Sequence, residues 1–146
     1  MWQERAVKIL IAADGSAYTK RMLAYIAAHD EWLGAQHDYT VIHGVLEVPH
    51  RAAAFAGQRL VREFYEADAE EVFRPIRAFF EQQRIAAKFV RTIGHVADSI
   101  AELASEGKFD LIVMGSRGHS DVVNLVLGSV VTKVLAKSSV PVLLIR

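Results

Sequence analysis

The sequence predicts a single-domain α/β protein built on an open five-stranded parallel sheet with helices on both faces. Short apolar runs alternate with helical patterns along the chain, and this alternation implies parallel strands joined by right-handed crossovers. The 146 residues suffice for one domain with one buried core, and the 52% hydrophobic and 23% charged content is typical of a packed fold. We find no internal repeat, so the predicted domain spans residues 1–146.

Five apolar runs are predicted strands. Four of them are aliphatic or β-branched almost throughout, as in strands buried on both faces of a parallel sheet, and they cover residues 7–13, 39–45, 111–114 and 140–145. The remaining run, 87–93, alternates because Lys88 and Arg91 stand among apolar neighbours. It therefore predicts an edge strand with one partly wet face.

Helical patterns separate the strands. Ser16 is a predicted N-cap for a helix that runs to about residue 33. Apolar residues at helical spacing predict a long helix over 59–84, in which Pro75 removes a backbone donor and favours a kink or a break near Arg74. Two shorter helices are expected over 96–107 and from about 128 to 137. The long connection 49–57 is the segment best suited to a mobile or lid-like role.

Composition argues against several classes of function. Lys plus Arg equals Asp plus Glu at 17 each, without a basic stripe, so no nucleic-acid partner is expected. The absence of cysteine excludes disulfides, thiol catalysis and zinc–thiolate sites. No apolar stretch approaches the ~20 residues of a membrane span, and the N-terminus lacks a signal-peptide pattern. We therefore expect a cytoplasmic protein without a membrane partner.

Two loops carry the candidate site residues. The first follows the opening strand, and its members are Ala13 and Asp14, with Gly15 and Ser16 after them. A carboxylate in this position can accept hydrogen bonds from ribose hydroxyls or help to hold Mg²⁺. The second loop follows the strand 111–114 and reads Met114, Gly115, Ser116, Arg117 and Gly118, then nine residues, then Gly128 and Ser129.

The second loop has the chemistry of an anion site. Its glycines can approach a phosphate without a Cβ clash. Gly128 and Ser129 begin the last predicted helix, where unpaired N–H groups and the positive dipole end favour an anion. The hydroxyls of Ser116 and Ser129 are further candidate donors, and Arg117 is the only cation within the Gly-x2-Gly segment.

Topology would bring the two loops together. In the strand order 3-2-1-4-5, strands one and four are neighbours where the winding reverses, and ligands of open α/β sheets bind outside the strand ends at that point. Simpler interpretations stay open, because each glycine alone fits an ordinary turn, and Asp14 to Ser16 could form only a turn and an N-cap. His43 is predicted to be a hydrogen-bonded core residue, and His119 either reaches a phosphate or is solvated.

Three segments in register carry a resemblance to a known family. Residues 9–16 read ILIAADGS, the glycines follow Gly-x2-Gly-x9-Gly-Ser from Gly115 to Ser129, and residues 140–145 read VPVLLI. Together they resemble the universal stress protein family, in its ATP-binding branch, over the whole chain. The resemblance implies a Rossmann-like fold of the adenine nucleotide alpha hydrolase type, ATP (or AMP or ADP) as ligand, and dimerisation through the last strand.

The resemblance also implies roles for individual residues. Asp14 would lie beside the ribose and the phosphates, and Gly44 would contact adenine through main-chain groups. Met114 and Gly115 would flank the ribose. The phosphates would be cradled by Gly118, Gly128, Ser129 and Val130.

The chain departs from the family pattern beside this cradle. ATP-binding members often carry Ser or Thr where this sequence has Val131, and Thr132 follows one residue later. We therefore predict the loss of one hydroxyl contact, which bears on triphosphate preference more than on nucleotide binding. Asp121 also places a carboxylate close to the expected phosphates.

The function predicted from these observations is adenine-nucleotide binding by a stress-response protein, acting as a nucleotide-dependent regulatory or interaction module with an unidentified protein partner. Efficient catalysis is not expected, because the phosphate loop contains no Lys and no catalytic residue can be assigned. Two alternatives remain open. One is a slow ATP hydrolase that uses Mg²⁺ and Asp14, and the other is a nucleotide-free dimeric stress scaffold.

The last strand also predicts an oligomeric state. Pro141 cannot donate to a ladder, so it marks an edge strand. An apolar edge that starts at Val140 and ends at Ile145 favours aggregation unless something covers it. A second copy paired across a two-fold axis would cover it, which predicts a homodimer.

Overall fold

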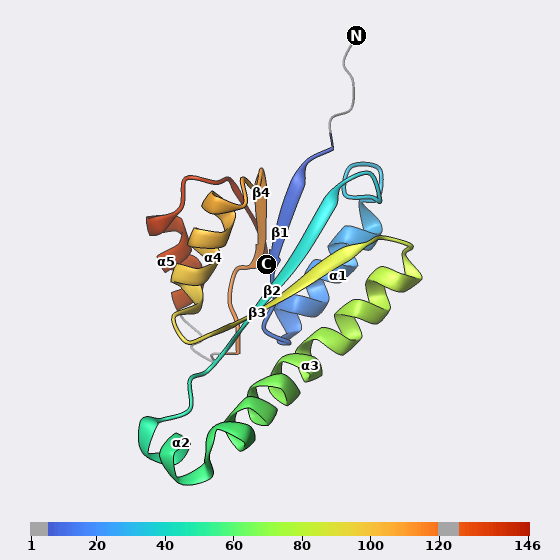
Figure 1. Cartoon of the computed structure of the whole chain (residues 1–146). Coiled ribbons are helices and arrows are strands. Elements are labelled where there is room, and N and C mark those ends of the chain that lie inside the picture. Colours follow the sequence, from blue (N-terminus) through green and yellow to red (C-terminus); the bar gives the residue numbers. More distant parts are fainter. Residues whose placement is uncertain (1–5, 120–125) are drawn as a thin grey trace.

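The computed structural model describes residues 6–119 and 126–146 and confirms the predicted architecture. Five parallel strands form one sheet in the order β3-β2-β1-β4-β5 (Figure 1). The strands are β1 (Lys8–Ala12), β2 (Asp38–Val45), β3 (Ala87–Ile93), β4 (Leu111–Gly115) and β5 (Val142–Ile145). The helices are α1 (Ala17–Ala28), α2 (His50–Ala56), α3 (Gln58–Gln82), α4 (Val96–Glu106) and α5 (Ser129–Lys137).

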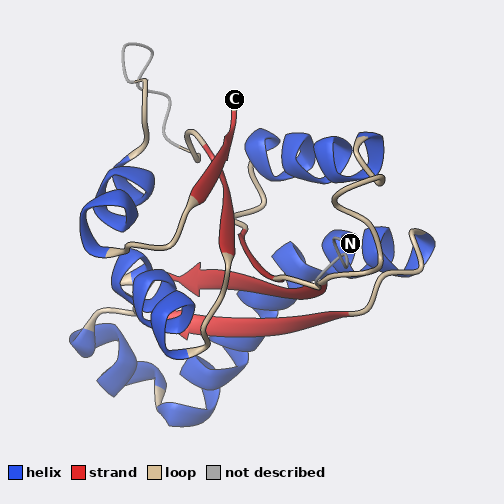
Figure 2. Ribbon diagram, turned by 90° about the horizontal axis from the view of Figure 1, so that it is seen from above, coloured by secondary structure: helices blue, strands red, loops and turns tan. Residues whose placement is uncertain are grey.

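The sheet separates two hydrophobic cores. Successive side chains of a strand point to opposite faces, so Ile9 and Ile11 of β1 pack in the core that α1 and α3 cover. Leu10 packs in the core that α4 and α5 cover. Figures 1 and 2 show these two helix pairs on opposite sides of the strands. Helices therefore cover both faces of the sheet, and the edge strand β3 keeps an alternating pattern in which Lys88 and Arg91 are exposed.

β1 lies at the point where the winding reverses. It pairs with β2 on one side and with β4 on the other, so that Ala12 is the register partner of both Ile42 and Met114. The carboxyl ends of these three strands therefore meet at one edge of the sheet. The loops that follow β1 and β4 are held together there, as the sequence predicts.

The first helix is shorter than the sequence pattern predicts. α1 ends at Ala28 rather than near residue 33. The N–H of His29 donates to the carbonyls of Tyr25 and Ile26, and the N–H of Leu33 donates to the carbonyl of His29. Leu33 still packs in the core. Because its spacing from Met22 and Ile26 fits a helix, the sequence pattern predicted a longer one.

Pro75 does not break the long helix. α3 runs from Gln58 to Gln82 as one element with Pro75 inside it. Proline removes one backbone bond, and the carbonyl deprived of its donor belongs to Glu71. Both residues are exposed, so water can satisfy that carbonyl. Phe73 and Ile76 anchor the buried side of the helix on either side of the proline.

The connection 49–57 is a helix rather than a loop. α2 occupies His50–Ala56 and buries none of its residues. Pro49 precedes it without a side-chain cap, and Gly57, at φ 89°, separates it from α3. Figure 1 shows α2 beyond the carboxyl ends of the strands. A lid-like role for this helix stays a prediction.

β5 is an edge strand, and β3 forms the other edge. The strand begins at Val142, so Pro141 precedes it instead of lying within it. The Pro141 carbonyl nevertheless accepts a bond from the Ile112 N–H at 2.9 Å. Within residues 6–119 and 126–146, no helix combines the length and the apolar character that a bilayer span requires.

Tyr39 makes the stability of the fold depend on pH in the alkaline range. Its side chain is fully buried, and its hydroxyl donates to the Gly34 carbonyl at 2.9 Å. Burial raises the pKa of Tyr39 to about 12. The neutral phenol is therefore favoured in the folded state, and its contribution to stability is complete below about pH 10 and is lost as the pH rises toward about 12.

Tyr39→Phe is expected to lower the free energy of unfolding by about 1–2 kcal/mol near neutral pH, because the buried Gly34 carbonyl loses its donor. Above about pH 10 the wild type should lose up to about 1.4 kcal/mol per pH unit relative to the variant, so the difference shrinks. Urea unfolding of both proteins at several pH values measures this. If the free energy of unfolding changed with pH in the same way in both proteins, the raised pKa would not belong to Tyr39.

Candidate functional site

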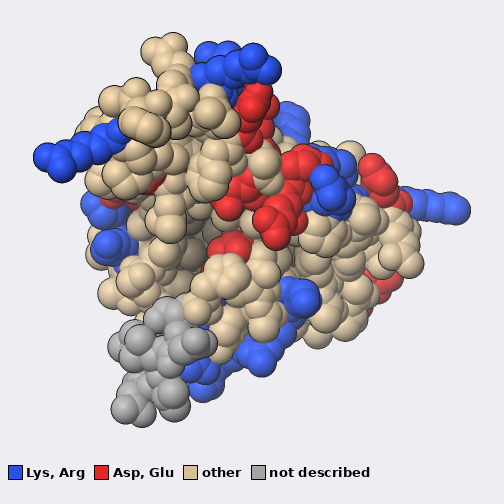
Figure 3. All heavy atoms as spheres, turned by 90° about the horizontal axis from the view of Figure 1, so that it is seen from below, with Lys and Arg blue, Asp and Glu red and all other residues tan. Residues whose placement is uncertain are grey.

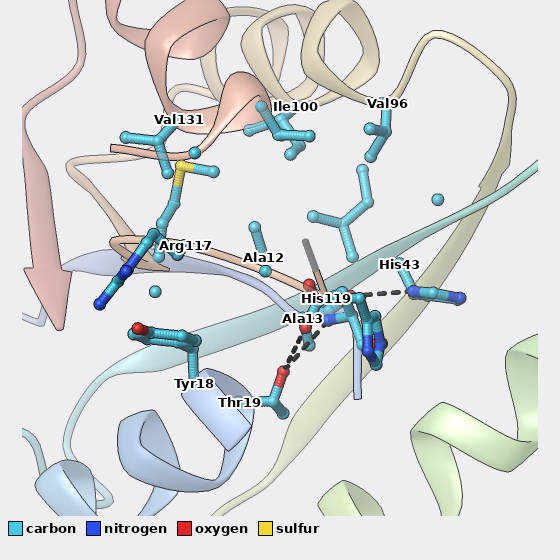
Figure 4. Close-up of a pocket in the computed structure, with 18 of the residues that line it drawn as sticks. Ala12, Ala13, Tyr18, Thr19, His43, Val96, Ile100, Arg117, His119 and Val131 are labelled. Carbon is cyan, nitrogen blue, oxygen red and sulfur yellow. Dashed lines mark hydrogen bonds between the residues drawn. The ribbon is translucent and has the colours of Figure 1, made fainter. Parts of the chain in front are cut away.

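A cavity of about 310 Å³ lies at the carboxyl ends of the central strands. Figure 4 shows Val131 of α5 with Ile100 and Val96 of α4 on one side, and Tyr18 and Thr19 of α1 on the other. All the predicted site residues except Ser116 line this cavity, namely Ala13, Asp14, Gly44, Met114, Gly115, Arg117, Gly118, Gly128, Ser129 and Val130. The structure thus brings residues from four separate segments to one place.

The turn after β1 fixes the Asp14 carboxylate. Oδ1 accepts from the Ser16 N–H at 2.9 Å and from the Thr19 hydroxyl at 3.1 Å. The Thr19 hydroxyl oxygen in turn accepts from the N–H groups of Asp14 and Gly15, each at 3.1 Å. Ser16 caps α1 by accepting from the Tyr18 N–H. The turn-and-cap interpretation is therefore correct, and it also orients a carboxylate at the cavity.

Two glycines are required by the close approach of the two loops. A Cβ built on Gly118 would lie 2.5 Å from Oδ2 of Asp14. A Cβ built on Gly115 would lie 2.5 Å from Cβ of Tyr18. Both separations are far shorter than van der Waals contact, so any side chain would force the loops apart. The spacing of glycines in the sequence reflects this packing.

Ser116 is set apart from the other predicted site residues. It is only 4% exposed and does not line the cavity. Its N–H donates to the Ile145 carbonyl at 2.8 Å, and its carbonyl accepts from the Gly128 N–H at 2.7 Å. These backbone bonds turn the residue into the fold, so Ser116 shapes the loop, and the role of its hydroxyl stays a prediction.

The start of α5 forms one end of the cavity. Gly128 is the N-cap, and the first helical residues Ser129, Val130 and Val131 all line the cavity. The first N–H groups of a helix have no partner within it and carry the positive end of its dipole. The Thr132 hydroxyl donates to the Gly128 carbonyl at 2.9 Å, so it does not replace the hydroxyl missing at Val131.

The other end of the cavity is apolar. Its lining includes Gly44 at the end of β2, with Ile42, Val96, Ile100 and Met114 around it. Val96 and Ile100 occupy the first turns of α4, where sequence analysis predicted a helix but assigned no site residue. Their spacing of four residues marks one helix face, although the pattern alone does not show that this face meets Gly44.

Two histidines bind consecutive backbone carbonyls at the cavity. His43 is 6% exposed, and its Nδ1 lies 2.9 Å from the Ala13 carbonyl. His119 brings Nε2 to 2.6 Å from the Asp14 carbonyl. Carbonyls only accept, so both nitrogens carry a proton. The prediction for His43 is confirmed, and His119 joins the second loop to the first.

Arg117 lies beside an aromatic ring. Its guanidinium carbon is 5.6 Å from the centroid of Tyr18, and that of Arg21 is 4.7 Å from the same centroid. Figure 4 shows Arg117 next to Tyr18 at the cavity wall. Asp121 lies outside the described residues. Among those that are described, no group of three or more His, Asp and Glu side chains could hold a metal ion.

Comparison with known proteins relates this chain to one family. Residues 7–146 match the model of the "Universal stress protein family". A Thermus aquaticus protein, the "Universal stress protein in QAH/OAS sulfhydrylase 3′ region", is 37% identical over 139 residues, covering 94% of this chain and 97% of that protein.

Solved structures share the fold at lower sequence identity. Universal stress protein UspA from Lactobacillus plantarum has a TM-score of 0.79 at 20% identity, and the match covers 99% of this chain and 100% of that one. A family protein from Arabidopsis thaliana with AMP bound has a TM-score of 0.68 at 13% identity, with 95% of this chain and 90% of that one covered.

Proposed function

Because the chain belongs to the universal stress protein family, we propose that it binds an adenine nucleotide in the cavity between the Asp14 turn and the start of α5. The observation that carries this proposal is that the Asp14 turn, the glycine loop and the first turn of α5 line one cavity. The AMP bound to the Arabidopsis thaliana relative supports the choice of ligand class. ATP and ADP belong to the same proposal.

The chemistry of the lining suggests an orientation for the nucleotide. The apolar end, with Ile42, Val96 and Ile100, suits the adenine ring, and the main chain of Gly44 offers hydrogen-bonding groups. Asp14 suits a ribose hydroxyl, because a carboxylate is an acceptor. Phosphates suit the opposite end, where the N-terminus of α5 attracts an anion.

We propose a binding module instead of an efficient enzyme. Asp14 is the only carboxylate among the described lining residues, and because its Oδ1 is engaged by the Ser16 N–H and the Thr19 hydroxyl, only Oδ2 is left to act as a base. A general base needs a free acceptor aimed at the attacking water. If Mg²⁺ accompanies the phosphates, Asp14 offers it one carboxylate ligand, and phosphate oxygens and water would supply the others.

Titration calorimetry of the nucleotide-free full chain with AMP and with ATP, in the presence and absence of Mg²⁺, tests the proposal. We expect saturable binding near one nucleotide per chain and a rise in melting temperature with nucleotide concentration. No heat together with an unchanged melting temperature would refute nucleotide binding and favour the scaffold alternative. Phosphate release that collapses in Asp14→Ala while binding persists would favour the hydrolase.

A homodimer through β5 remains our prediction for the assembly. β5 is an edge strand of four residues, Val142–Ile145, and all of them are apolar. Pairing with a second copy would satisfy its outward backbone groups and cover these side chains. Light scattering at micromolar protein concentration should give the mass of two chains. A monomer mass across a dilution series would contradict it.

A further inference from the structure

The phosphate end of the cavity carries little positive charge. The ionisable side chains that line the cavity are Asp14, Tyr18, His43, Arg117 and His119. Arg117 alone among them has a permanent positive charge, and its guanidinium lies against Tyr18. His43 and His119 direct ring nitrogens at backbone carbonyls. The lining residues that the structure describes therefore offer no pair of permanent cations to clamp a chain of phosphates.

A negative charge lies at the same end. Oδ2 of Asp14 comes within 2.5 Å of the place where a Cβ of Gly118 would be, so the carboxylate borders the glycine loop directly. Each phosphate beyond the first brings added negative charge toward this carboxylate, and like charges repel strongly where water is partly excluded.

Among the residues that the structure describes, few uncharged donors are placed for extra phosphates. Val131 is 3% exposed and presents methyl groups to the cavity, and Thr132 spends its hydroxyl proton on the Gly128 carbonyl. In the described part of the lining, the remaining donors are the first turn of α5, the Ser129 hydroxyl and the Tyr18 hydroxyl. The N-terminus of a helix is equivalent to roughly half a positive charge. That arrangement suits one phosphate.

The charge of the surrounding surface and the size of the cavity also favour a ligand with one phosphate. Figure 3 shows Asp and Glu side chains gathered near the middle of the face viewed from below, with Lys and Arg around them. This is the side of the molecule where the strands end (Figure 1). The cavity, at about 310 Å³, is at the small end of the range of ~300–1,000 Å³ found for ligand pockets.

We infer that the site selects adenine nucleotides with a single phosphate over ATP. The inference rests on the proposed function, because it concerns the ligand of the same cavity. The selectivity arises from the Asp14 carboxylate, the single permanent cation and the methyl groups of Val131.

Affinities of the full nucleotide-free chain for adenosine, AMP, ADP and ATP, measured by calorimetry without Mg²⁺, test the inference. We expect AMP to bind at least about tenfold more tightly than ATP, with ADP between them and adenosine weaker than AMP. Equal or tighter binding of ATP would overturn the inference and leave the proposed function standing. Absence of binding by all four compounds would overturn both.

A matched pair of variants tests the charge argument. His119 lines the cavity beside Gly118, so His119→Lys places a permanent cation there, and His119→Gln removes the imidazole without adding charge. His119→Lys should narrow the preference for AMP over ATP about tenfold relative to His119→Gln. If both variants had the same ratio of AMP to ATP affinity, charge would not be the cause of the selectivity. The wild type titrated with AMP and with ATP in the presence of Mg²⁺ should also show a smaller preference for AMP, because the ion neutralises phosphate charge.

Discussion

Gly118→Val is expected to weaken AMP binding at least about 100-fold, or about 2.7 kcal/mol, while the chain stays folded. The new Cβ would lie 2.5 Å from Oδ2 of Asp14, so the carboxylate and the loop must separate. The valine methyl groups would then occupy the space that the phosphate needs. The φ of Gly118 is not in the left-handed region, so the loss comes from steric exclusion and not from backbone strain.

The measurement is calorimetry with AMP, paired with urea unfolding to confirm the fold. Gly128→Val should also lose binding, because its Cβ would lie 3.3 Å from the Arg117 backbone at the same end. Gly57→Ala is a matched control, since its Cβ meets nothing within 4 Å although its φ of +89° is strained. It should lose stability and keep AMP affinity. If both valine variants bound AMP normally, the phosphate would not lie at Gly118 and Gly128.

Gly44→Ala is expected to lower the free energy of unfolding by about 1–3 kcal/mol, as overpacking does in cores. A Cβ on Gly44 would lie 2.5 Å from Cβ of Val96. Either the end of β2 or the first turn of α4 must move, and both line the apolar end of the cavity. AMP binding should weaken along with stability.

A double-mutant cycle locates the cause. Val96→Gly removes the atoms that the new methyl group would meet, so Gly44→Ala in that background should cost at least about 1 kcal/mol less than in the wild type. Gly57→Ala combined with Val96→Gly provides the additive reference, because those two residues share no contact in the Cβ geometry. Additive losses in the Gly44 cycle would show that Val96 is not what excludes a side chain at this position.

Much of the fold was predictable because it depends on local patterns. Buried parallel strands are apolar on both faces, and this property located four of the strands, whereas its alternation marked β3 as an edge strand. The strand order 3-2-1-4-5 was a hypothesis, because alternation with helices predicts parallel strands but leaves their order open, and the structure confirms it. α2 escaped prediction because it has neither a side-chain cap nor a buried face. The exposed face of α3 explains why Pro75 failed to end that helix.

The candidate site was predictable where backbone chemistry selects the residue type. Asp14 accepts hydrogen bonds in the turn after β1, Gly118 packs against its carboxylate and Gly128 caps α5, so their pattern is visible in sequence. The close approach of Val96 to Gly44 could not be predicted from the sequence, because both residues fit ordinary helix and strand positions. The bond of His119 to the Asp14 carbonyl depends on how two distant loops meet. The backbone bonds of Ser116 to Ile145 and Gly128 were not visible either, and the role of its hydroxyl stays a prediction.

The backbone of Ser116 connects the two surfaces on which the proposed activity depends. On one side its carbonyl holds the Gly128 N–H at the start of α5, and on the other its N–H holds the Ile145 carbonyl in the edge strand. A ligand that shifted this loop would therefore act on the same residue that bonds the end of β5. Linkage requires the coupling to be reciprocal, so a nucleotide that tightens association of two chains is itself bound more tightly by the associated form, by the same factor.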